Sequence, residues 1–570
     1  MNEDGIVSSP FPKVSDKLAE GRDLWEFIQE RIKQVIRNNG DKPMWIDGIA
    51  DKSITYAQFL DRVEKMAHFF SQTLEMKRGS KLIMSCCGDV NFFVVVFAAV
   101  ALGILVFSIP SYALECIPIC LREDAGIKVI VCDEDNVSNI TELLASAETN
   151  SRETGEQIES PKVFLIEGDH PIYENIPSIL QSSALAETND DRINYPEIDD
   201  GDEDCVVFFS SGSTGVPKPI VHTRANMLSI AFNVSDNWVS KEKESEVKLS
   251  TFNQGHAGGF IMFILNLTAA STLVGVSKPT PENILRAIEK YQTTAVNIYP
   301  KQAILISKMD NLHSFNLSSV KELSSSAATF PNSIIPTLKT VFFNVKRPVE
   351  QLYGSTETLC ISSSTGIGAD ENEAGVGHLL PYAQLKVIDV RSNKALGPNQ
   401  PGEILIRHKF RFKEYRHRSK LTAESLAEDG WFLMGDYGFY DENGRLHILD
   451  RVKELINLPD DRIVSPSHIE DITLRHPAVK LVGVSGIPSI EGGSLPRAFV
   501  VPLSYHNSIE AWEIVTFVSA QAGESSHLHL IGGAEVVPEG MEITSLAGKI
   551  YRTKLQQLYL SRLQRNATDS

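Results

Sequence analysis

The sequence predicts an α/β protein with parallel-rich sheets flanked by helices. Short β-rich runs alternate along the chain with stretches of helical periodicity, such as residues 55–74. Parallel strands are buried on both faces and need helical crossovers, so this alternation favours parallel sheets. The runs that carry the prediction are KLIMSC, KVIVCD, KVFLIE, CVVFFS and STLVGV. A chain of 570 residues also exceeds what one hydrophobic core usually organises, so we expect two or more domains.

The segment Phe92–Phe107 is apolar almost throughout and raises the question of a membrane span. It is shorter than the roughly 18 to 20 residues that a span needs. Gly103 interrupts the segment and Pro110 follows it. We interpret it as a buried helix that turns at the glycine into a core strand, and expect no integral membrane segment.

Composition and charge narrow the choice of partners. Hydrophobic residues make up 42% of the chain and charged residues 22%, as in a globular protein. The net charge of −19 disfavours binding to nucleic acid or to anionic membranes. Seven cysteines with neither a CxxC pair nor zinc-like spacing suit a reducing compartment. With neither a secretory pattern nor a targeting signal at its ends, the sequence predicts a cytoplasmic protein.

The stretch Val206–Thr223, VVFFSSGSTGVPKPIVHT, follows an acidic connector at Asn189–Cys205. Glycines let a backbone approach an anion closely, hydroxyl groups donate hydrogen bonds, and a lysine adds positive charge. The candidate phosphate-binding residues are Ser210, Ser211, Gly212, Ser213, Thr214, Gly215 and Lys218. Their spacing is not that of a P-loop nucleotidase. A flexible Ser/Gly linker remains the alternative on composition alone.

Four blocks in order resemble the adenylate-forming enzyme superfamily, which includes acyl-CoA and coumarate-CoA ligases, firefly luciferase and nonribosomal adenylation domains. The first block is SSGSTGVPKP, and the second, QLYGSTET, matches a Tyr-Gly-x-Thr-Glu motif. The third, GWFLMGDYGFYDENGRLHILDRVKELI, contains Gly-Asp and Asp-Arg-x-Lys, and the fourth, LAGKIYR, contains Gly-Lys. With weaker motifs the resemblance extends from about residue 20 to 565.

The resemblance assigns the nucleotide side of a site. It implies that Glu357 binds magnesium, that Thr356 contacts phosphate and that Tyr353 lies against the adenine. Magnesium prefers hard oxygen ligands, and cations near the transferred phosphate stabilise its developing charge. Taken alone, YGSTE could equally be a helix start with Ser or Thr capping.

The resemblance also implies roles for residues of the third and fourth blocks. Asp436 would accept hydrogen bonds from the ribose hydroxyls, and Arg451 would contact ribose or phosphate. Lys549 would reach the carboxylate and α-phosphate during adenylation. In isolation, an Asp-Gly turn, a surface ion pair and a solvated lysine would explain these three residues.

The resemblance places a domain boundary at Lys453, the position of a hinge about which a small, mobile α+β C-terminal domain rotates between two half-reactions. It predicts a large multi-subdomain N-terminal domain over residues 21–452 and the smaller domain over 453–565. Residues 1–20 and 566–570 are predicted tails. Rotation would remove Lys549 and admit a thiol.

The acyl side is less clear. His256, in FNQGHAGGF, falls where relatives carry a residue beside the acyl pocket, and a core histidine is the alternative. Asn253 follows Phe252 where amino-acid-activating relatives place an Asp, which argues against an α-amino acid. The segment SSSAATF has Ser326 and Ala327 in place of glycines, which predicts a narrowed or reshaped pocket.

Other departures from the family concern the thiol side and the phosphate loop. After the hinge, Asn457 replaces a lysine, and Asp460 and Asp461 could repel an anionic CoA. Pro219 and Glu414 each replace a glycine.

The resemblance therefore implies an enzyme that uses ATP and Mg²⁺ to activate a small-molecule carboxylic acid as acyl-AMP, then transfers the acyl group to a thiol. Coenzyme A is the first choice of acceptor, which would make the protein an acyl-CoA synthetase-like ligase. The alternatives are loading of carrier-protein phosphopantetheine in trans and a nucleotide-binding pseudoenzyme. The catalytic set implied is Lys549, Thr356, Glu357 and His256.

Overall fold

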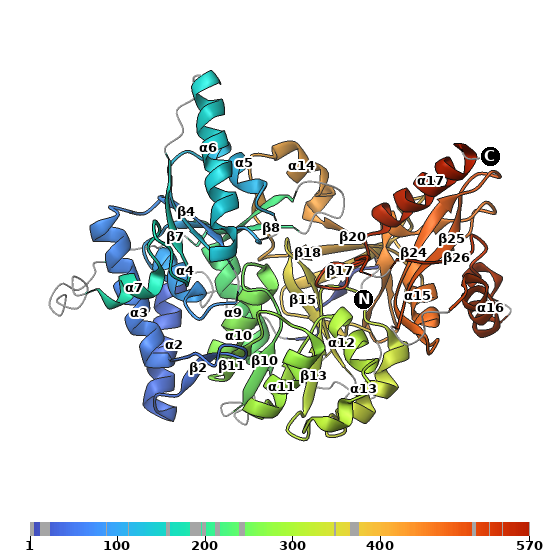
Figure 1. Cartoon of the computed structure of the whole chain (residues 1–570), viewed down its shortest axis with the longest axis horizontal. Helices are drawn as coiled ribbons and strands as arrows, with labels where there is room; N and C mark the ends of the chain where they lie inside the picture. The colour runs from blue at the N-terminus through green and yellow to red at the C-terminus, as the bar shows by residue number, and fades with distance from the viewer. Residues whose placement is uncertain are drawn as a thin grey trace.

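A computed structural model describes residues 5–11, 23–86, 88–111, 113–154, 160–182, 195–196, 201–210, 217–238, 246–346, 349–364, 375–503, 509–523, 525–538 and 540–568. Two large, mostly parallel sheets with helices on both faces form the main body, and the C-terminal elements lie to one side, at the right of Figure 1. The predicted α/β class, with parallel-rich sheets and a smaller α+β C-terminal region, is confirmed.

The first large sheet has seven strands, in the order β19-β9-β8-β5-β4-β6-β7. The strands from β8 to β7 are parallel, whereas β9 and β19 pair antiparallel at one edge. The bounds are β4 Lys81–Ser85, β5 Leu105–Ser108, β6 Ile127–Cys132, β7 Lys162–Leu165, β8 Asp204–Phe209, β9 Pro219–Thr223 and β19 Glu414–Tyr415. Every strand run that the sequence indicated in this part of the chain is therefore a strand.

The second large sheet has nine strands, in the order β16-β15-β14-β13-β12-β10-β11-β2-β3. Its middle strands are parallel and its ends antiparallel. The bounds are β2 Pro43–Asp47, β3 Ser53–Thr55, β10 Val247–Ser250, β11 Thr272–Gly275, β12 Ala295–Asn297, β13 Glu322–Ser325, β14 Glu350–Ser355, β15 Leu359–Ser363 and β16 His378–Leu379.

Helices between the two sheets build a shared core, because alternate strand residues point to opposite faces. The inner helices are α2 Leu24–Asn39, α3 Tyr56–His68, α4 Phe92–Ala101, α9 Arg224–Trp238 and α10 Ala257–Thr268. Outer helices cover the far face of each sheet through separate cores. These are α5 Cys116–Glu123 and α6 Val137–Thr154 on one side, and α11 Pro281–Tyr291, α12 Pro300–Ser307 and α13 Ile335–Val341 on the other.

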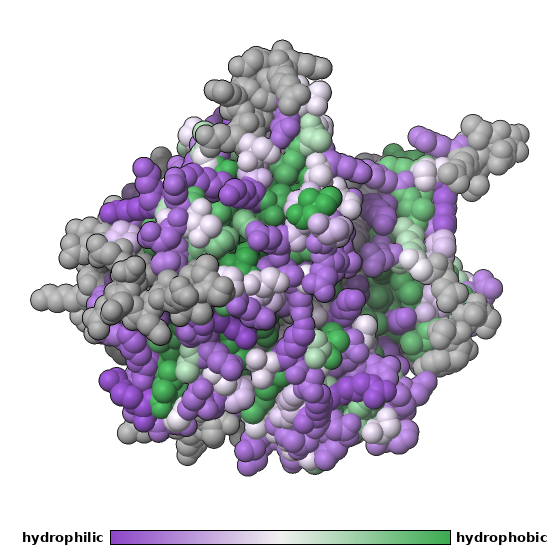
Figure 2. All heavy atoms as spheres, turned by 60° about the vertical axis from the view of Figure 1, so that its left-hand side comes forward, coloured by the Kyte–Doolittle hydropathy of each residue, from purple (hydrophilic) through white to green (hydrophobic). Residues whose placement is uncertain are grey.

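The apolar segment Phe92–Phe107 is part of this inner layer. All ten residues of α4 are buried, Gly103 turns the chain with φ 68°, and β5 follows at the centre of the seven-stranded sheet. The predicted buried helix and core strand are confirmed. Polar side chains cover most of the face seen in Figure 2, with apolar ones scattered among them. In the part of the chain that the structure describes, no helix is both long and apolar enough to cross a membrane.

A third, antiparallel sheet lies between the large body and the C-terminal elements, in the order β1-β17-β18-β20-β21. Its strands are β1 Val7–Ser8, β17 Ala383–Ile388, β18 Gly402–His408, β20 Phe432–Tyr440 and β21 Leu446–Arg451. Strand β1 lies within residues 1–20, which the sequence analysis assigned to a flexible tail. It pairs with β17 and covers what would otherwise be an open sheet edge.

The C-terminal elements follow the short helix η7 Val452–Glu454 and the hairpin of β22 Ile456–Asn457 and β23 Ile463–Val464. A three-stranded sheet, β24 Val479–Pro488, β25 Ser494–Pro502 and β26 Ala534–Val536, packs against α15 Pro466–Leu474 and α16 Ala511–Ala522 around one core. Helix α17 Arg552–Thr568 packs against the same sheet through a second, smaller core. Helix α17 thus enters the stretch 566–570 that was predicted to be a tail.

Candidate functional site

The predicted phosphate loop joins the antiparallel strands β8 and β9, and only its ends belong to the described residues. Ser211, Gly212, Ser213, Thr214 and Gly215 lie outside the described residues. At the base of the loop, the backbone N–H of Ser210 donates to the carbonyl of Lys218 at 3.1 Å. The N–H of Lys218 donates back to Ser210 Oγ at 3.2 Å. The Lys218 ammonium lies 5.4 Å from the centroid of the Tyr415 ring, where a cation is attracted to the ring face.

Thr356 and Glu357 lie in a tight turn between β14 and β15, so the YGSTE block is a hairpin and not a helix start. The turn is closed by Ser355 and Thr358, whose side chains each accept a hydrogen bond from the other residue's backbone N–H. Gly354 is required here, because a Cβ at this position would meet the Leu359 carbonyl oxygen at 1.6 Å.

Neighbouring elements hold this turn from three sides. His222 Nε2 is 2.7 Å from the Thr356 carbonyl oxygen. The N–H of Phe412 donates to the Glu357 carbonyl at 2.6 Å. The Tyr415 hydroxyl donates to Glu357 Oε1 at 2.8 Å. Tyr415 in turn pairs with β9, the strand that carries His222, so the edge of the seven-stranded sheet orients the turn.

His222, near the end of the stretch Val206–Thr223, has a role that the sequence did not predict. It is fully buried, and burial lowers the pKa of His222 to about 4, so the ring is neutral. Asn226 Nδ2 lies 3.4 Å from Nδ1, which assigns Nδ1 as acceptor and leaves Nε2–H to donate to Thr356. The sequence feature that could have identified His222 is a histidine in an otherwise apolar strand directly after a Ser/Gly loop.

Asp436 is buried in β20, so a surface turn does not describe it. Its carboxylate accepts a 2.6 Å hydrogen bond from the Tyr353 hydroxyl and lies 3.0 Å from Arg451 Nε, directly across the strand pair. Burial raises the pKa of Asp436, while the positive charge of Arg451 opposes the rise. Tyr353, Asp436 and Arg451 therefore come together as predicted.

Lys549 lies on a turn before α17 and points into the same site. Its backbone is held by Ser545, which exchanges two hydrogen bonds with it. Burial, followed by the positive charge of Arg451, lowers the pKa of Lys549 to about 8, whereas Asp436 and Glu357 act in the opposite direction. Lys549 is thus not an ordinary solvated lysine.

His256 is the N-cap residue of α10, although its side chain makes no capping hydrogen bond. Burial, followed by the positive charge of Lys549, lowers the pKa of His256 to about 4. Lys453 belongs to the same group of charges. Partial burial and the positive charges of Arg451 and Lys218 lower the pKa of Lys453, while Glu454 raises it.

The structure describes several of the residues that depart from the family pattern on the acyl and thiol sides. Ala327 keeps a glycine-like backbone, with φ 78°, and its side chain is exposed. Asp460 is paired with Arg462, whose Nη2 lies 2.6 Å from Asp460 Oδ2, and Arg391 donates to the Asp461 carbonyl at 2.8 Å. The pairing of Asp460 reduces the acidity that the loop presents.

The site fits a nucleotide phosphate with a magnesium ion. Lys549 and Arg451 are close enough for the charge of Arg451 to disfavour the Lys549 ammonium, and an anionic group bound beside them would relieve this repulsion. Within the described ranges, no cluster of three His, Cys, Asp or Glu side chains could hold a metal ion. A single carboxylate such as Glu357, together with phosphate oxygens, is the way Mg²⁺ is commonly bound.

The fold and the site define an adenylate-forming enzyme of the acid-thiol ligase class. The chain belongs to the AMP-binding enzyme family, whose model matches residues 32–416. It is 27% identical to 4-coumarate-CoA ligase 1 of Narcissus pseudonarcissus over 531 residues, 92% of each protein. It is 31% identical to a luciferin 4-monooxygenase of Nipponoluciola cruciata over 355 residues, 62% of this chain and 63% of that protein.

Solved structures share the fold over most of their length. The anthranilate CoA ligase AuaEII in complex with anthranoyl-AMP has a TM-score of 0.80 at 18% identity, covering 95% of this chain and 98% of that one. ATP-bound MatB from Rhodopseudomonas palustris has a TM-score of 0.76 at 20% identity, covering 94% and 99%.

Proposed function

We propose that this protein activates a carboxylic acid with ATP and Mg²⁺, releases pyrophosphate, and transfers the acyl group from acyl-AMP to the thiol of coenzyme A. The observation that carries the proposal is the convergence of Lys549 and Arg451 with Asp436 and Glu357, drawn from four separate elements. It matches what the motif resemblance implied, and the family includes relatives named as CoA ligases.

In the proposed first half-reaction, Asp436 accepts hydrogen bonds from the ribose hydroxyls and Arg451 binds ribose or phosphate. Tyr353 lies against the adenine, and Thr356 contacts phosphate together with the loop from Ser210 to Lys218. Mg²⁺, bound through Glu357, would neutralise phosphate charge.

On the acyl side of the same half-reaction, Lys549 holds the substrate carboxylate beside the α-phosphate. The lysine must be protonated to stabilise the negative charge that develops there. His256, which is near enough to Lys549 for the lysine charge to lower its pKa, lines the acyl pocket in this proposal.

In the proposed second half-reaction, residues 453–565 rotate about Lys453 as a unit against residues 21–452. The rotation withdraws Lys549 and lets a thiol attack the acyl carbon, which expels AMP. The described cysteines, free and mostly buried, fit a reducing compartment such as the cytoplasm.

The test is pyrophosphate release from purified protein with ATP, Mg²⁺ and a panel of fatty, aryl and amino acids, with and without coenzyme A. Steady acid-dependent turnover only with coenzyme A would support the proposal and identify the acid class. A single turnover that coenzyme A does not extend would replace it by carrier-protein loading. Nucleotide binding without release for any acid would indicate a pseudoenzyme.

A matched control uses two lysines close in the sequence. Lys549→Ala should abolish the acid-dependent signal, whereas Lys554→Ala, which removes a lysine from exposed α17 surface, should leave it unchanged. Equal activity of the two variants would contradict the role of Lys549.

A further inference from the structure

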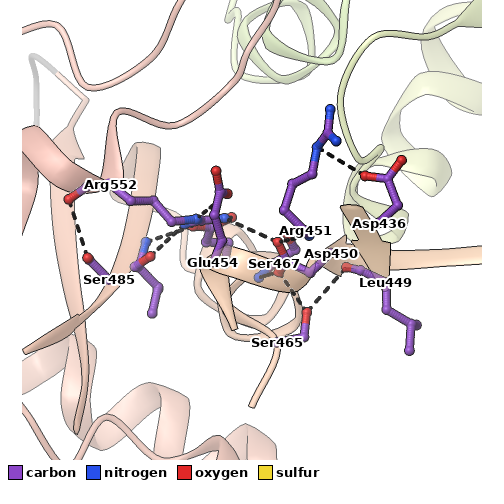
Figure 3. Close-up of polar contacts among 11 residues, drawn as sticks. Asp436, Leu449, Asp450, Arg451, Glu454, Ser465, Ser467, Ser485 and Arg552 are labelled. Atoms are coloured by element: carbon purple, nitrogen blue, oxygen red, sulfur yellow. Dashed lines mark hydrogen bonds and ion pairs between the residues drawn. The ribbon is translucent and has the colours of Figure 1, made fainter. Parts of the chain in front are cut away.

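An ion cluster near the site joins the start of α17 to three acids between residues 450 and 470. The Arg552 guanidinium contacts three carboxylates: Glu454 through Nε at 2.9 Å, Glu470 through a short Nη1 contact, and Asp450 at 3.9 Å. Figure 3 shows the Arg552 side chain extending toward Glu454 and Asp450. We call Arg552, Asp450, Glu454 and Glu470 the Arg552 cluster.

The cluster is largely shielded from water. The exposed fraction of the side chains is 11% for Arg552, 3% for Asp450, 20% for Glu454 and 12% for Glu470. Ion pairs at such burial are much less screened by solvent than surface pairs. Removing the one cation would leave three acids facing one another without compensation.

Backbone groups fix the geometry of Arg552 further. Its Nη1 donates to the Val484 carbonyl in β24 at 2.5 Å, and the Val484 N–H donates to Glu470 at 2.7 Å. The Ser485 hydroxyl donates to the Arg552 carbonyl at 3.3 Å. A guanidinium supplies several donors in a planar fork, which a lysine ammonium cannot reproduce.

The members of the cluster are neighbours of residues in the proposed active site. Arg552 follows Lys549 by three residues, and the turn that carries Lys549 begins at Ser545. Asp450 precedes Arg451, whose side chain pairs with Asp436 (Figure 3). The cluster therefore ties the segment that carries Lys549 to the strand that carries Arg451.

Asp450 differs from the other two acids in its position in the chain. It is the second-to-last residue of β21, before the proposed hinge Lys453, whereas Glu454, Glu470 and Arg552 come after the hinge. Asp450 Oδ2 also accepts hydrogen bonds from Ser465 Oγ and from the N–H of Ser467, both at 2.9 Å, at the start of α15. Its contacts thus cross the proposed hinge and are made in the arrangement that places Lys549 in the site.

We infer that Arg552 is a positioning residue that, through the Arg552 cluster, holds Lys549 in the site for the adenylation half-reaction. The inference rests on the proposed function and adds a selective role: the cluster serves the first half-reaction and is not needed for thiol attack on acyl-AMP.

The experiment compares Arg552→Gln with Arg562→Gln, which removes another ion-paired arginine of α17 that contacts Glu535 away from the site. Two rates are measured: acid-dependent exchange of pyrophosphate into ATP, and thioester formation from synthetic acyl-AMP. Arg552→Gln should lower the first rate by about 10-fold or more, because a 1 Å displacement of a reacting group costs about that much or more, and change the second by less than about threefold. Arg562→Gln should change neither.

Loss of both rates to the same extent, or no loss of exchange, would overturn the inference. If Arg552→Gln does not fold, Glu454→Gln, which removes the most exposed acid of the cluster, should give a smaller loss that is still selective for exchange. Equal loss of the two rates in Glu454→Gln would count equally against the inference.

A second readout needs no substrate and separates this inference from the proposed function. Amide hydrogen exchange of residues 545–552 should be faster in Arg552→Gln than in the wild type and unchanged in Arg562→Gln. If the wild type shows no pyrophosphate exchange with any acid, the proposed function fails. Whether or not the proposed function holds, equal amide hydrogen exchange of residues 545–552 in Arg552→Gln and the wild type would contradict the positioning role.

Discussion

The two sides of the candidate site are built differently. On the nucleotide side, Asp436 lies on β20 of the third sheet and Glu357 in the turn between β14 and β15, and each accepts a hydrogen bond from a tyrosine hydroxyl on another strand. On the other side, Lys549 lies on a turn whose own hydrogen bonds are local, and the Arg552 cluster connects that turn, through Asp450, to β21 of the third sheet.

The difference suggests a division of labour. Strand pairs cannot shift without breaking ladders of hydrogen bonds, so the nucleotide side is preorganised. A turn held through one arginine can leave when a few ion pairs rearrange. A preorganised nucleotide side and a lysine that can leave the site suit the proposed enzyme, in which two half-reactions share one site.

The largest effect on activity should follow the loss of the Lys549 charge. Lys549→Ala should lower adenylate formation by about 100-fold or more, the scale typical for loss of a preorganised charge partner. Thioester formation from synthetic acyl-AMP should change little, since the proposed rotation withdraws Lys549 before that step. Near-normal pyrophosphate exchange would show that the two sides do not differ as described.

A smaller effect is expected on the rigid side. Asp436→Asn replaces the proposed acceptor of the ribose hydroxyls and leaves Arg451 without its carboxylate, so AMP should bind about 10 to 100-fold more weakly, as for a lost hydrogen bond to a charged group. Calorimetry measures the affinity directly. Asp61→Asn, at an exposed aspartate of α3 that pairs with Lys65, serves as control and should bind AMP normally.

The pH profile tests the charge state of Lys549. Because burial and Arg451 lower its pKa to about 8, the ammonium is present below that pH and is lost as the pH rises through it. The kcat/KM of adenylation should therefore fall by about fivefold between pH 8 and pH 9, as for a group with this pKa that must be protonated. Lys549→Arg, which stays charged, should lack this decline even if it is slower overall.

Variants of His222 test how the nucleotide side of the site is held in place. Leucine at this position would leave the Thr356 carbonyl without its donor, and we expect a loss of about fivefold in kcat/KM for Mg-ATP, within the range for an unsatisfied buried group. Glutamine can place an amide N–H near the position of Nε2, so His222→Gln should recover most of the rate. If the leucine and glutamine variants have the same kcat/KM for Mg-ATP, the hydrogen bond from His222 to Thr356 does not contribute to the reaction.

The smallest effect concerns Ala327, an alanine with a left-handed backbone. Ala327→Gly should relieve strain and stabilise the protein by about 0.5 to 1 kcal/mol, since this conformation costs an L-residue about 1 to 2 kcal/mol and glycine loses part of that gain to its greater flexibility when unfolded. Urea unfolding measures the shift. A destabilised variant would show that the methyl group makes contacts that outweigh the strain.

Much of the fold could be predicted from the sequence, because it follows from local patterns. Apolar runs became strands, and Phe92–Phe107 became a helix and a strand separated at a glycine. The roles of Tyr353, Glu357, Asp436, Arg451 and Lys549 were implied by the resemblance of short blocks to a known family. The hairpin at YGSTE was missed, because Ser and Thr near a Glu cap helices and close turns equally well.

The tertiary structure alone revealed what connects these residues. The partners His222 and Thr356 are 134 positions apart, and Arg552 lies 82 positions from Glu470 and 98 from Glu454. No local periodicity marks such pairs. The sequence by itself determined the elements, the family and the reactive side chains, because these depend on local spacing and chemistry. Only the packing of sheets and helices decided which charges face each other, because burial and mutual distance set both the pKa of Lys549 and the strength of the contacts that hold it.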